Sequence, residues 1–473
     1  MHPSIASLLE IAWEGPAGAR QFLLKLPDEA EIPPRVSELT GITASDLSLA
    51  VDPEIALRAL EEDLTPDSVI VAHYSQFERA FLGELYSRLR GGELPWKFLC
   101  TYKIAQRLHP EVPSRNIRAL VGFFSLGSSD LRRASQHAHA TALIWSKLGM
   151  EGKSFEEIET WLAATKAAKP ARVEFRIDRA TRLAFPEKPG VYRMLAQDGR
   201  VLYVGKATSL RSRVNSYFRG KKGQGKRKRE MLSQVWKIET TECGSALEAA
   251  LLENEEIKRL NPPYNTSLKA GTRGLRFFSR DLLSADDVQR VDFPIGPFGR
   301  NNSLELLGEW LRDPAAQIFH DEVAPETLLE GRAIFLAQHG FSSFPSVRAL
   351  VALGIWWGRA LEEPAEEEEE EEGADEAPLT PEEAAERYEG LCIRAGWEYL
   401  RAKRMGRLLN CRVHLGEKVL EVRGGRLGGD SPCGEMPWKG LGIADYDRMS
   451  VLLTEINRHA YPVEIYCVPA PGP

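Results

Sequence analysis

The sequence predicts a multidomain protein that combines α/β and α+β units. Its 473 residues correspond to about three domains of roughly 150 residues each. Near the N-terminus, short apolar runs alternate with helical patterns, as in "DSVIVAH" followed by "FERAFLGELYSRL", which is typical of an α/β domain. An acidic run near position 370 separates the last part of the chain from the rest.

Changes in composition divide the chain into five segments. We expect an α/β domain over 1–150, a compact unit over 172–273, a mainly helical region over 275–360, an acidic disordered linker over 362–378 and a small α+β domain over 381–473. The stretch "TKAAKPA", Thr165 to Ala171, is a predicted linker. The acidic run lacks large apolar side chains and repels itself, which favours a solvated spacer. Mimicry of nucleic acid is the alternative.

The last segment contains three predicted elements. The stretch "PEEAAERYEGLCIRAGWEYLRAKRMGRLL" predicts a helix, "VLEVRGGRL" a hairpin and "DYDRMSVLLTEINRHA" a second helix. The basic side chains of "EYLRAKRMGRLL" could touch DNA or form a solvated helix face; they are Arg401, Lys403, Arg404 and Arg407.

Composition excludes several classes of protein. The net charge of -7 gives no global sign of nucleic-acid binding, so any such function must be local. The N-terminus lacks a basic region followed by a long apolar core, and no run of 18 apolar residues exists, so we expect neither a signal peptide nor a membrane span. The six cysteines form no C-x-x-C pair, which predicts reduced thiols in a cytoplasmic protein without a zinc or iron–sulfur site.

In the second segment, "GVYRMLAQDGRVLYVGK" predicts a hairpin. Its two apolar-rich runs meet at Asp198-Gly199, a strong signal for a two-residue turn. That turn places Met194 opposite Tyr203 and Tyr192 opposite Gly205. Because side chains alternate along a strand, the two tyrosines share a face beside a glycine that leaves room for an incoming backbone. A pair of half-buried strand tyrosines is the alternative.

The next stretch, "TSLRSRVNSYF", predicts a helix that begins at good N-cap residues. Leu210, Val214 and Tyr217 recur at helical spacing and define one apolar stripe. Arg213 falls on the same stripe. An arginine on an inward face is costly unless it has an anionic partner, either a structural carboxylate or a bound phosphate.

A second helix is predicted by "SALEAALLENEEIKRLNPPYN". It opens with Ser245-x-x-Glu248, a capping box, and the Asn-Pro-Pro sequence ends it. Glu253 is a carboxylate on an otherwise apolar stripe, while Glu255 and Glu256 point away. The full stripe is Ala246, Ala249, Ala250, Glu253, Ile257 and Leu260. Arg213 and Glu253 could pair with each other, although no acid occurs between positions 199 and 229.

The elements "GVY", "YVGKATSLRSRVNSYF" and "ALLENEEIKRLNPPYN", in this order over about residues 175–273, resemble the GIY-YIG endonuclease domain. More narrowly, they resemble the N-terminal nuclease of the UvrC excinucleases and of their relative Cho. The resemblance implies a GIY-YIG fold and a role for each matching residue. Tyr203 would be a candidate general base assisted by Lys206, Tyr192 would line the site, Arg213 would contact the scissile phosphate, Glu253 would hold one Mg²⁺ or Mn²⁺, and Asn265 would support the site.

These residue types suit phosphodiester hydrolysis. The reaction needs an activated water and neutralisation of the phosphate oxygens, which a glutamate-bound divalent metal and Arg213 supply. A tyrosine has a reference pKa of about 10, so a nearby cation such as Lys206 is needed to favour the phenolate. Which of the two tyrosines is the base stays open.

The stretch "RGKKGQGKRKR", Arg219 to Arg229, predicts a flexible loop that binds DNA phosphates by charge. A merely solvated loop is the alternative. The expected DNA contacts are Tyr217, Arg219, Lys221, Lys222, Lys226, Arg227 and Lys228.

The first segment resembles a DnaQ-type 3'–5' exonuclease, nearest to exodeoxyribonuclease X, through "VIVAHYSQFERAFL" and "RRASQHAHATALIW". That resemblance implies an incomplete RNase H-like fold. The family binds two metals with four acids, but its opening Asp-x-Glu strand would precede this chain, whose first acid is Glu10. Glu78 matches the third acid, and the final His-x4-Asp falls on Arg132 and His137. We therefore expect a non-catalytic remnant used for binding. A start codon assigned too late would explain the missing strand but not His137.

Together these patterns predict a cytoplasmic, metal-dependent DNA endonuclease of nucleotide excision repair or related DNA repair. Its partners would be DNA and a damage-recognition protein, without a membrane. The resemblance to the UvrC excinucleases omits their second nuclease, their helix-hairpin-helix pair and their UvrB-binding motif. Two alternatives are a non-catalytic DNA-binding or adaptor protein, which the intact set of site residues opposes, and an active exonuclease with an accessory GIY-YIG domain, which His137 opposes.

Overall fold

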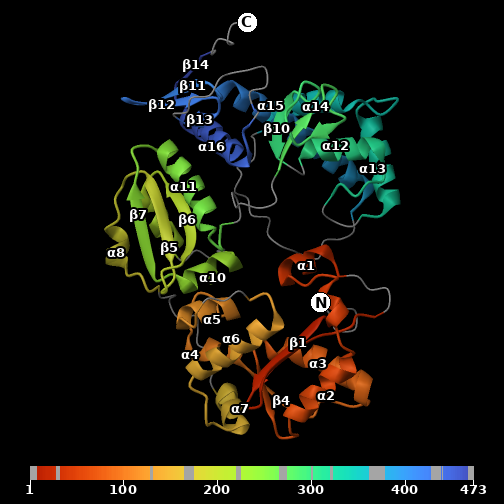
Figure 1. The fold of residues 1–473 in the computed structure, drawn as a ribbon, viewed down its shortest axis with the longest axis vertical. Coiled ribbons are helices and arrows are strands. Elements are labelled where there is room, and N and C mark those ends of the chain that lie inside the picture. The colour runs from red at the N-terminus through yellow and green to blue at the C-terminus, as the bar shows by residue number, and fades with distance from the viewer. Residues whose placement is uncertain are drawn as a thin grey trace.

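The computed structural model describes residues 8–27, 32–127, 131–164, 175–219, 225–265, 274–299, 302–319, 323–361, 379–427, 438 and 440–466. The N-terminal part lies at one end of the molecule, the unit around β5 to β7 lies beside it, and the helical and C-terminal parts lie at the other end (Figure 1). The predicted linker at 165–171 and the acidic run at 362–378 fall outside the described residues.

The N-terminal part has the alternation of strands and helices that the sequence predicts. Strands β1 (Glu10–Gly15) and β2 (Gly18–Leu23) form an antiparallel hairpin, and β3 (Val69–Ala72) pairs in parallel with β4 (Lys97–Cys100). A parallel pair needs a crossover, and α3 (Ser75–Arg90) supplies it. The other helices are α1 (Pro34–Thr40), α2 (Pro53–Asp63), α4 (Thr101–Leu108), α5 (Ile117–Phe124), α6 (Ala134–Lys147) and α7 (Phe155–Ala164), with a 3-10 turn at Asp46–Leu49.

The next unit is an antiparallel sheet of order β6-β5-β7 with helices packed on both faces. Its strands are β5 (Gly190–Leu195), β6 (Val201–Ala207) and β7 (Lys237–Glu242). Its helices are α8 (Arg179–Leu183), α9 (Leu210–Tyr217), α10 (Lys226–Gln234) and α11 (Ala246–Leu260). The sequence predicts a loop over 219–229, but a helix begins at Lys226, so that part of the prediction is wrong.

The hairpin between β5 and β6 has the predicted register but a different turn. Met194 lies opposite Tyr203 and Tyr192 opposite Gly205, as expected. The turn is longer than two residues, because the Ala196 N–H donates to the Arg200 carbonyl at 2.9 Å. Leu195 consequently pairs with Val201, and a register shift restores the pairing beyond it. Gly199 adopts a φ of 83°, a conformation that favours glycine.

Residues 275–299 contain three short strands and no helix, although the sequence predicts a mainly helical region over 275–360. Strands β8 (Leu275–Phe278), β9 (Ala285–Asp286) and β10 (Ile295–Gly299) pair in the order β10-β8-β9. Runs of two to five residues are too short for their periodicity to reveal a strand. The helices of this region are α12 (Ser303–Arg312), α13 (Pro325–Gln338) and α14 (Val347–Trp357), followed by a 3-10 turn at Gly358–Ala360.

The C-terminal part contains the predicted helices α15 (Pro381–Leu408) and α16 (Ile443–His459). The predicted hairpin is present as β12 (Lys418–Arg423) and β13 (Arg426–Leu427), in a sheet completed by β11 (Cys411–Leu415) and β14 (Val463–Ile465). The first half of α15 packs with α12 to α14. There the ring of Tyr388 stacks on that of Trp310, with 4.0 Å between the ring centres. The long helix therefore joins the helical region to the C-terminal sheet.

Helix α11 is buried on two sides, which decides where the site residues lie. Ala249 and Ile257 pack on Val191 and Val204 of the sheet. Leu247 packs into a separate core with α16. Among the described residues, no helix is both long and apolar enough to cross a membrane.

Candidate active site

Three tyrosines converge on the α9 face of the β5–β6 pair. Tyr192 is fully buried, and its hydroxyl oxygen lies 2.8 Å from that of Tyr217 on α9. The ring of Tyr203 is centred 6.1 Å from Tyr192 and 6.2 Å from Tyr217. The strand register predicts the first pair, and Tyr217 comes from the apolar stripe of α9.

Gly205 is required by this cluster, but not for the expected reason. The sequence predicts space for an incoming backbone beside it. Instead, a Cβ at Gly205 would lie 2.3 Å from the Tyr192 hydroxyl oxygen and 2.8 Å from Tyr203 Cε1. The tyrosine rings therefore occupy the space that a side chain would need.

Burial keeps the two predicted base candidates protonated. It raises the pKa of Tyr192 well above its usual value, and it also raises the pKa of Tyr203. The charge of Arg213 acts in the opposite direction on both pKa values, whereas Glu253 raises that of Tyr203 further. Either tyrosine can act as a base only in its ionised form, so its ionisation depends on positive charge near the cluster.

Arg213 is exposed, whereas the sequence predicts an inward-facing arginine. Leu210, Val214 and Tyr217 fill the apolar stripe of α9 as expected. Arg213 lies at the edge of that stripe, with its guanidinium carbon 5.6 Å from the centre of the Tyr217 ring. The residue is thus exposed overall, while its guanidinium stays beside the tyrosine cluster, where its charge lowers the pKa values of Tyr192 and Tyr203.

Glu253 and Asn265 cover the outer edge of β6, which is an edge strand of its sheet. Asn265 is buried; its side-chain oxygen accepts the Val204 N–H at 3.0 Å, and its amide donates to the Val204 carbonyl at 2.9 Å. Two residues along, the Lys206 N–H donates to Glu253 Oε1 at 2.8 Å. Both side chains satisfy backbone groups that an edge strand would otherwise leave unpaired.

Lys206 contacts carboxylates rather than Tyr203. Its Nζ lies 2.9 Å from Glu455 Oε1 and 3.8 Å from Glu253 Oε2. Tyr203 and Lys206 are three residues apart on one strand, so their side chains leave it on opposite faces. The expected assistance of Tyr203 by Lys206 is therefore not seen in this structure.

The position of Glu256 also differs from the predicted one. The sequence places it on the outer side of its helix, but it is buried and forms an ion pair with Arg193 of β5, whose Nε donates to Glu256 Oε2 at 2.6 Å. A helix that packs on two sides buries more positions than one apolar stripe includes.

The expected DNA contacts are partly on the surface. Lys226 and Arg227 of α10 are exposed, as is Arg219. Tyr217 is buried, and Lys228 Nζ lies 4.3 Å from the centre of its ring. Lys221 and Lys222 fall outside the described residues.

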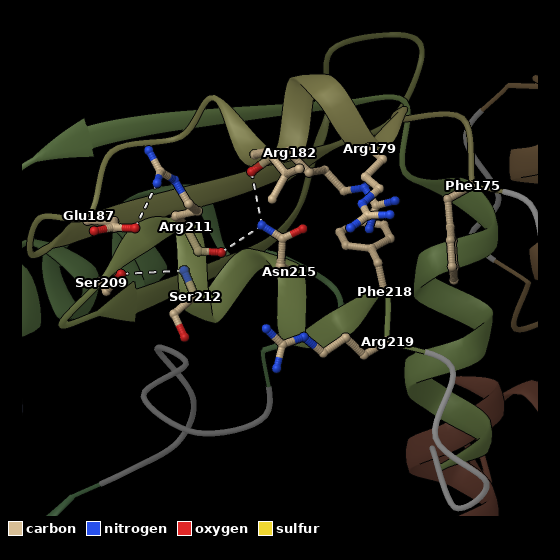
Figure 2. Close-up of a pocket in the computed structure, with 11 residues that line it drawn as sticks. Phe175, Arg179, Arg182, Glu187, Ser209, Arg211, Ser212, Asn215, Phe218 and Arg219 are labelled. Carbon is tan, nitrogen blue, oxygen red and sulfur yellow. Dashed lines mark hydrogen bonds and ion pairs between the residues drawn. The ribbon is translucent and has the colours of Figure 1, made fainter.

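An arginine-lined pocket of about 740 Å³ lies between α8 and α9. Arg179, Arg182 and Arg219 line it near Phe218, and Arg211 lies at the other end in an ion pair with Glu187 at 2.7 Å (Figure 2). Sequence reasoning missed Arg179 and Arg182. Their spacing of three residues on a helix capped by Asp178 was the available signal.

The residues that match the exonuclease family, Glu10, Glu78 and His137, do not form a cluster like that of the three tyrosines. Glu10 accepts hydrogen bonds from Arg133 at 2.7 Å and from the Ala134 N–H at 2.8 Å. His137 Nε2 lies 3.0 Å from the Leu131 carbonyl oxygen, and Glu78 is exposed on α3. Across the described part of the chain, no three His, Cys, Asp or Glu side chains are grouped so that they could hold a metal ion.

Comparison with known proteins assigns the central unit to a class. Residues 188–266 match the family model of the UvrC-like GIY-YIG domain. The match includes β5, β6, α9, α11 and Asn265, on which the site is built. This part of the chain is a GIY-YIG nuclease domain of the UvrC-like kind.

Two relatives match different shares of the chain. MT2247 of Mycobacterium tuberculosis, named as a bifunctional exonuclease/endonuclease protein, is 32% identical over 299 residues, which cover 60% of this chain and 44% of that protein. UvrABC system protein C of Stenotrophomonas maltophilia is 45% identical over 109 residues, or 23% of this chain and 17% of that protein. The chain thus spans less than half the length of these relatives.

A solved structure also matches part of the chain. The magnesium-bound GIY-YIG N-terminal endonuclease domain of UvrC from Thermotoga maritima is 33% identical and covers 19% of this chain and 94% of that domain, with a TM-score of 0.17.

Proposed function

We propose that this chain is a metal-dependent DNA endonuclease that acts through its GIY-YIG site, in nucleotide excision repair or a related repair pathway. The observation that supports it most is the arrangement around the edge of β6. Glu253 lies there beside Asn265, and the Tyr192–Tyr203–Tyr217 cluster with Arg213 lies on the adjoining face.

Glu253 is the residue that we propose to hold a divalent metal. Mg²⁺ keeps most of its water ligands and commonly uses only one or two protein carboxylates together with substrate phosphate. The Glu253 side chain is 14% exposed, so its carboxylate is held in place yet reaches solvent. Bound Mg²⁺ or Mn²⁺ would polarise a phosphate oxygen and stabilise its developing charge.

The chain's own residues would share the remaining tasks. Arg213 reaches solvent beside the tyrosines, so its planar donors would contact the scissile phosphate. Tyr203 is half-buried, whereas Tyr192 is fully enclosed and bonded to Tyr217, so Tyr203 is the better placed to accept a proton from water at its hydroxyl oxygen. Asn265 would fix the backbone of β6 under the site.

DNA would contact the basic surface around this site. Arg213, Arg219, Lys226 and Arg227 are exposed on or next to α9 and α10. The arginine-lined pocket continues this surface on the other side of α9. Such a surface neutralises backbone phosphates without reading sequence, and a damage-recognition protein would then supply the target.

The N-terminal part would bind rather than cleave, and the protein would act in the cytoplasm. Arg133 engages Glu10 and His137 stands where the family has an acid, so metal binding lacks its carboxylates there. The name of MT2247 favours the alternative, an exonuclease active beside the endonuclease. Digestion of a 3'-labelled single strand that is lost in Glu78→Ala would support that alternative.

The proposed endonuclease is tested by nicking of supercoiled and of damaged duplex DNA with Mg²⁺ or Mn²⁺. Glu253→Gln keeps the side-chain volume but removes the charge that would hold the metal, so nicking should be lost while DNA binding persists. Glu78→Ala serves as the matched control and should nick normally. Full nicking by Glu253→Gln together with loss in Glu78→Ala would assign the chemistry to the N-terminal part.

A further inference from the structure

The C-terminal part is joined to the nuclease site through helix α16. Leu247 of α11 packs with Met449 and Leu452 of α16 in one core. Polar contacts flank this core: Lys258 of α11 pairs with Asp447 at 2.9 Å, and Lys206 of β6 pairs with Glu455 at 2.9 Å. The packing brings a residue 249 positions away in sequence next to the site.

Glu455 is buried at this junction, with 1% of the residue exposed. A buried carboxylate is costly unless cations surround it. Besides Lys206, the Arg458 guanidinium supplies positive charge from the next turn of α16, with Nη1 3.4 Å from Glu455 Oε1. His459 Nε2 lies 3.2 Å from Glu455 Oε2 and adds charge only when its ring is protonated. Three basic side chains therefore hold Glu455 at the junction, and among the described residues the one that comes from outside its own helix is Lys206.

Lys206 lies between two carboxylates that belong to different parts of the chain. Its Nζ is 0.9 Å closer to Glu455 than to Glu253, at 2.9 Å against 3.8 Å. Its own backbone N–H meanwhile binds Glu253 Oε1. An ammonium group paired directly with Glu253 would compete with a divalent metal for the same oxygens.

We propose that Glu455 is a positioning residue for the nuclease site: it holds the Lys206 ammonium at closer range than Glu253 does, and so weakens the competition between that ammonium and a divalent metal for the Glu253 carboxylate. The inference rests on the proposed function, because it takes Glu253 as the metal-holding residue. It makes the C-terminal part a component of the site, and not only an attached domain. Residues that orient a metal-binding side chain typically change metal affinity by about 10- to 100-fold when removed.

The test is Mn²⁺ binding to the full chain, measured by the electron paramagnetic resonance signal of free Mn²⁺ in the absence of DNA. Glu455→Gln should weaken binding by about 10-fold or more, because Lys206 then turns to Glu253. The double variant Glu455→Gln with Lys206→Met should recover the affinity, since the competing ammonium is gone. Asp447→Asn is the matched control, because it breaks a second ion pair of the same junction with the same change in charge, and it should bind Mn²⁺ normally.

Three results would overturn the inference: unchanged binding by Glu455→Gln, no recovery in the double variant, or an equal loss in Asp447→Asn. The last two would mean that docking of α16 matters and the position of Lys206 does not. If Glu455→Gln does not fold, Glu455→Asp keeps the charge but shortens the reach to Lys206 and should weaken Mn²⁺ binding in the same direction. Glu253→Gln separates the two proposals: normal Mn²⁺ binding by that variant would refute the metal site itself.

Discussion

The hydroxyl oxygens of Tyr192 and Tyr217 lie 2.8 Å apart, beside a glycine whose missing side chain makes the contact possible. One tyrosine comes from the central strand of a three-stranded sheet and the other from the helix that covers it. Their contact holds α9, and with it Arg213, against β5 and the neighbouring strand β6, which carries Tyr203. The geometry of the proposed site therefore depends on packing as much as on the reacting groups.

Gly205→Ala should disturb this packing directly. The added methyl group would meet the Tyr192 hydroxyl at 2.3 Å, so the ring must move. Overpacking of this kind costs about 1–3 kcal/mol of unfolding free energy, and nicking should fall with it. Chemical denaturation and nicking assays measure both effects. Gly299→Ala in β10 is the control, because among the described residues no atom beyond its chain neighbours lies within 4 Å of its added Cβ. Equal destabilisation by both variants would contradict the prediction.

Asn265→Ala should expose the backbone of β6. It removes both bonds to Val204, and each buried group left unpaired costs about 1–3 kcal/mol. Hydrogen exchange at the Val204 amide should become faster, and nicking should decrease. Asn302→Ala removes the cap of α12 and lowers stability elsewhere, so it should leave Val204 protected. Normal protection of Val204 in Asn265→Ala would show that this side chain does not hold the strand.

How much of this site the sequence predicts depends on distance along the chain. Alternation along two adjacent strands is enough to bring Tyr192 and Tyr203 together, and helical spacing places Glu253 and Tyr217. The predicted turn is wrong because a longer loop and a compensating register shift give the same strand pairing as the expected two-residue turn.

Contacts between distant segments leave no such pattern. Nothing in the local sequence of α16 links Glu455 to Lys206, and the burial of Glu256 follows from the second surface that packs on α11. For Arg179 and Arg182 the spacing on one helix is visible in the sequence, but their position next to Arg219 depends on the packing of α8 on α9.

Tyr203→Phe should remove the dependence of nicking on pH. Burial raises the pKa of Tyr203, so only a small fraction of the base form exists near neutral pH and the wild-type rate should rise about tenfold per pH unit. Tyr203→Phe should lose about 10²- to 10⁴-fold in rate and show a flat profile. Tyr192→Phe should keep the slope, and a flat profile for Tyr192→Phe instead would make Tyr192 the base.

Stability should not distort this profile. A tyrosine whose pKa is raised in the folded state contributes stability that is fully present below its unfolded pKa of about 10. That contribution is lost only as the pH rises through the folded-state value. The buried thiols of Cys392 and Cys411 also have their pKa values raised by burial, to about 12, so they begin to lose their contribution to stability above their unfolded pKa of about 8.5. Rates measured up to about pH 7.5 therefore report on the base, and denaturation curves between about pH 6.5 and 7.5 should superimpose.

Replacing Arg179, Arg182 and Arg219 together by Gln should weaken DNA binding similarly for all sequences. If the pocket contacts backbone phosphates, each lost contact lowers the slope of log affinity against log salt by up to about 0.9 on duplex DNA. Arg290, Arg312 and Arg348 are exposed arginines outside the nuclease unit, and replacing them by Gln makes the same change in charge without altering the pocket. The slopes come from fluorescence anisotropy titrations at several salt concentrations. A slope that changes equally in both triple variants would mean that overall charge, and not this pocket, governs DNA binding.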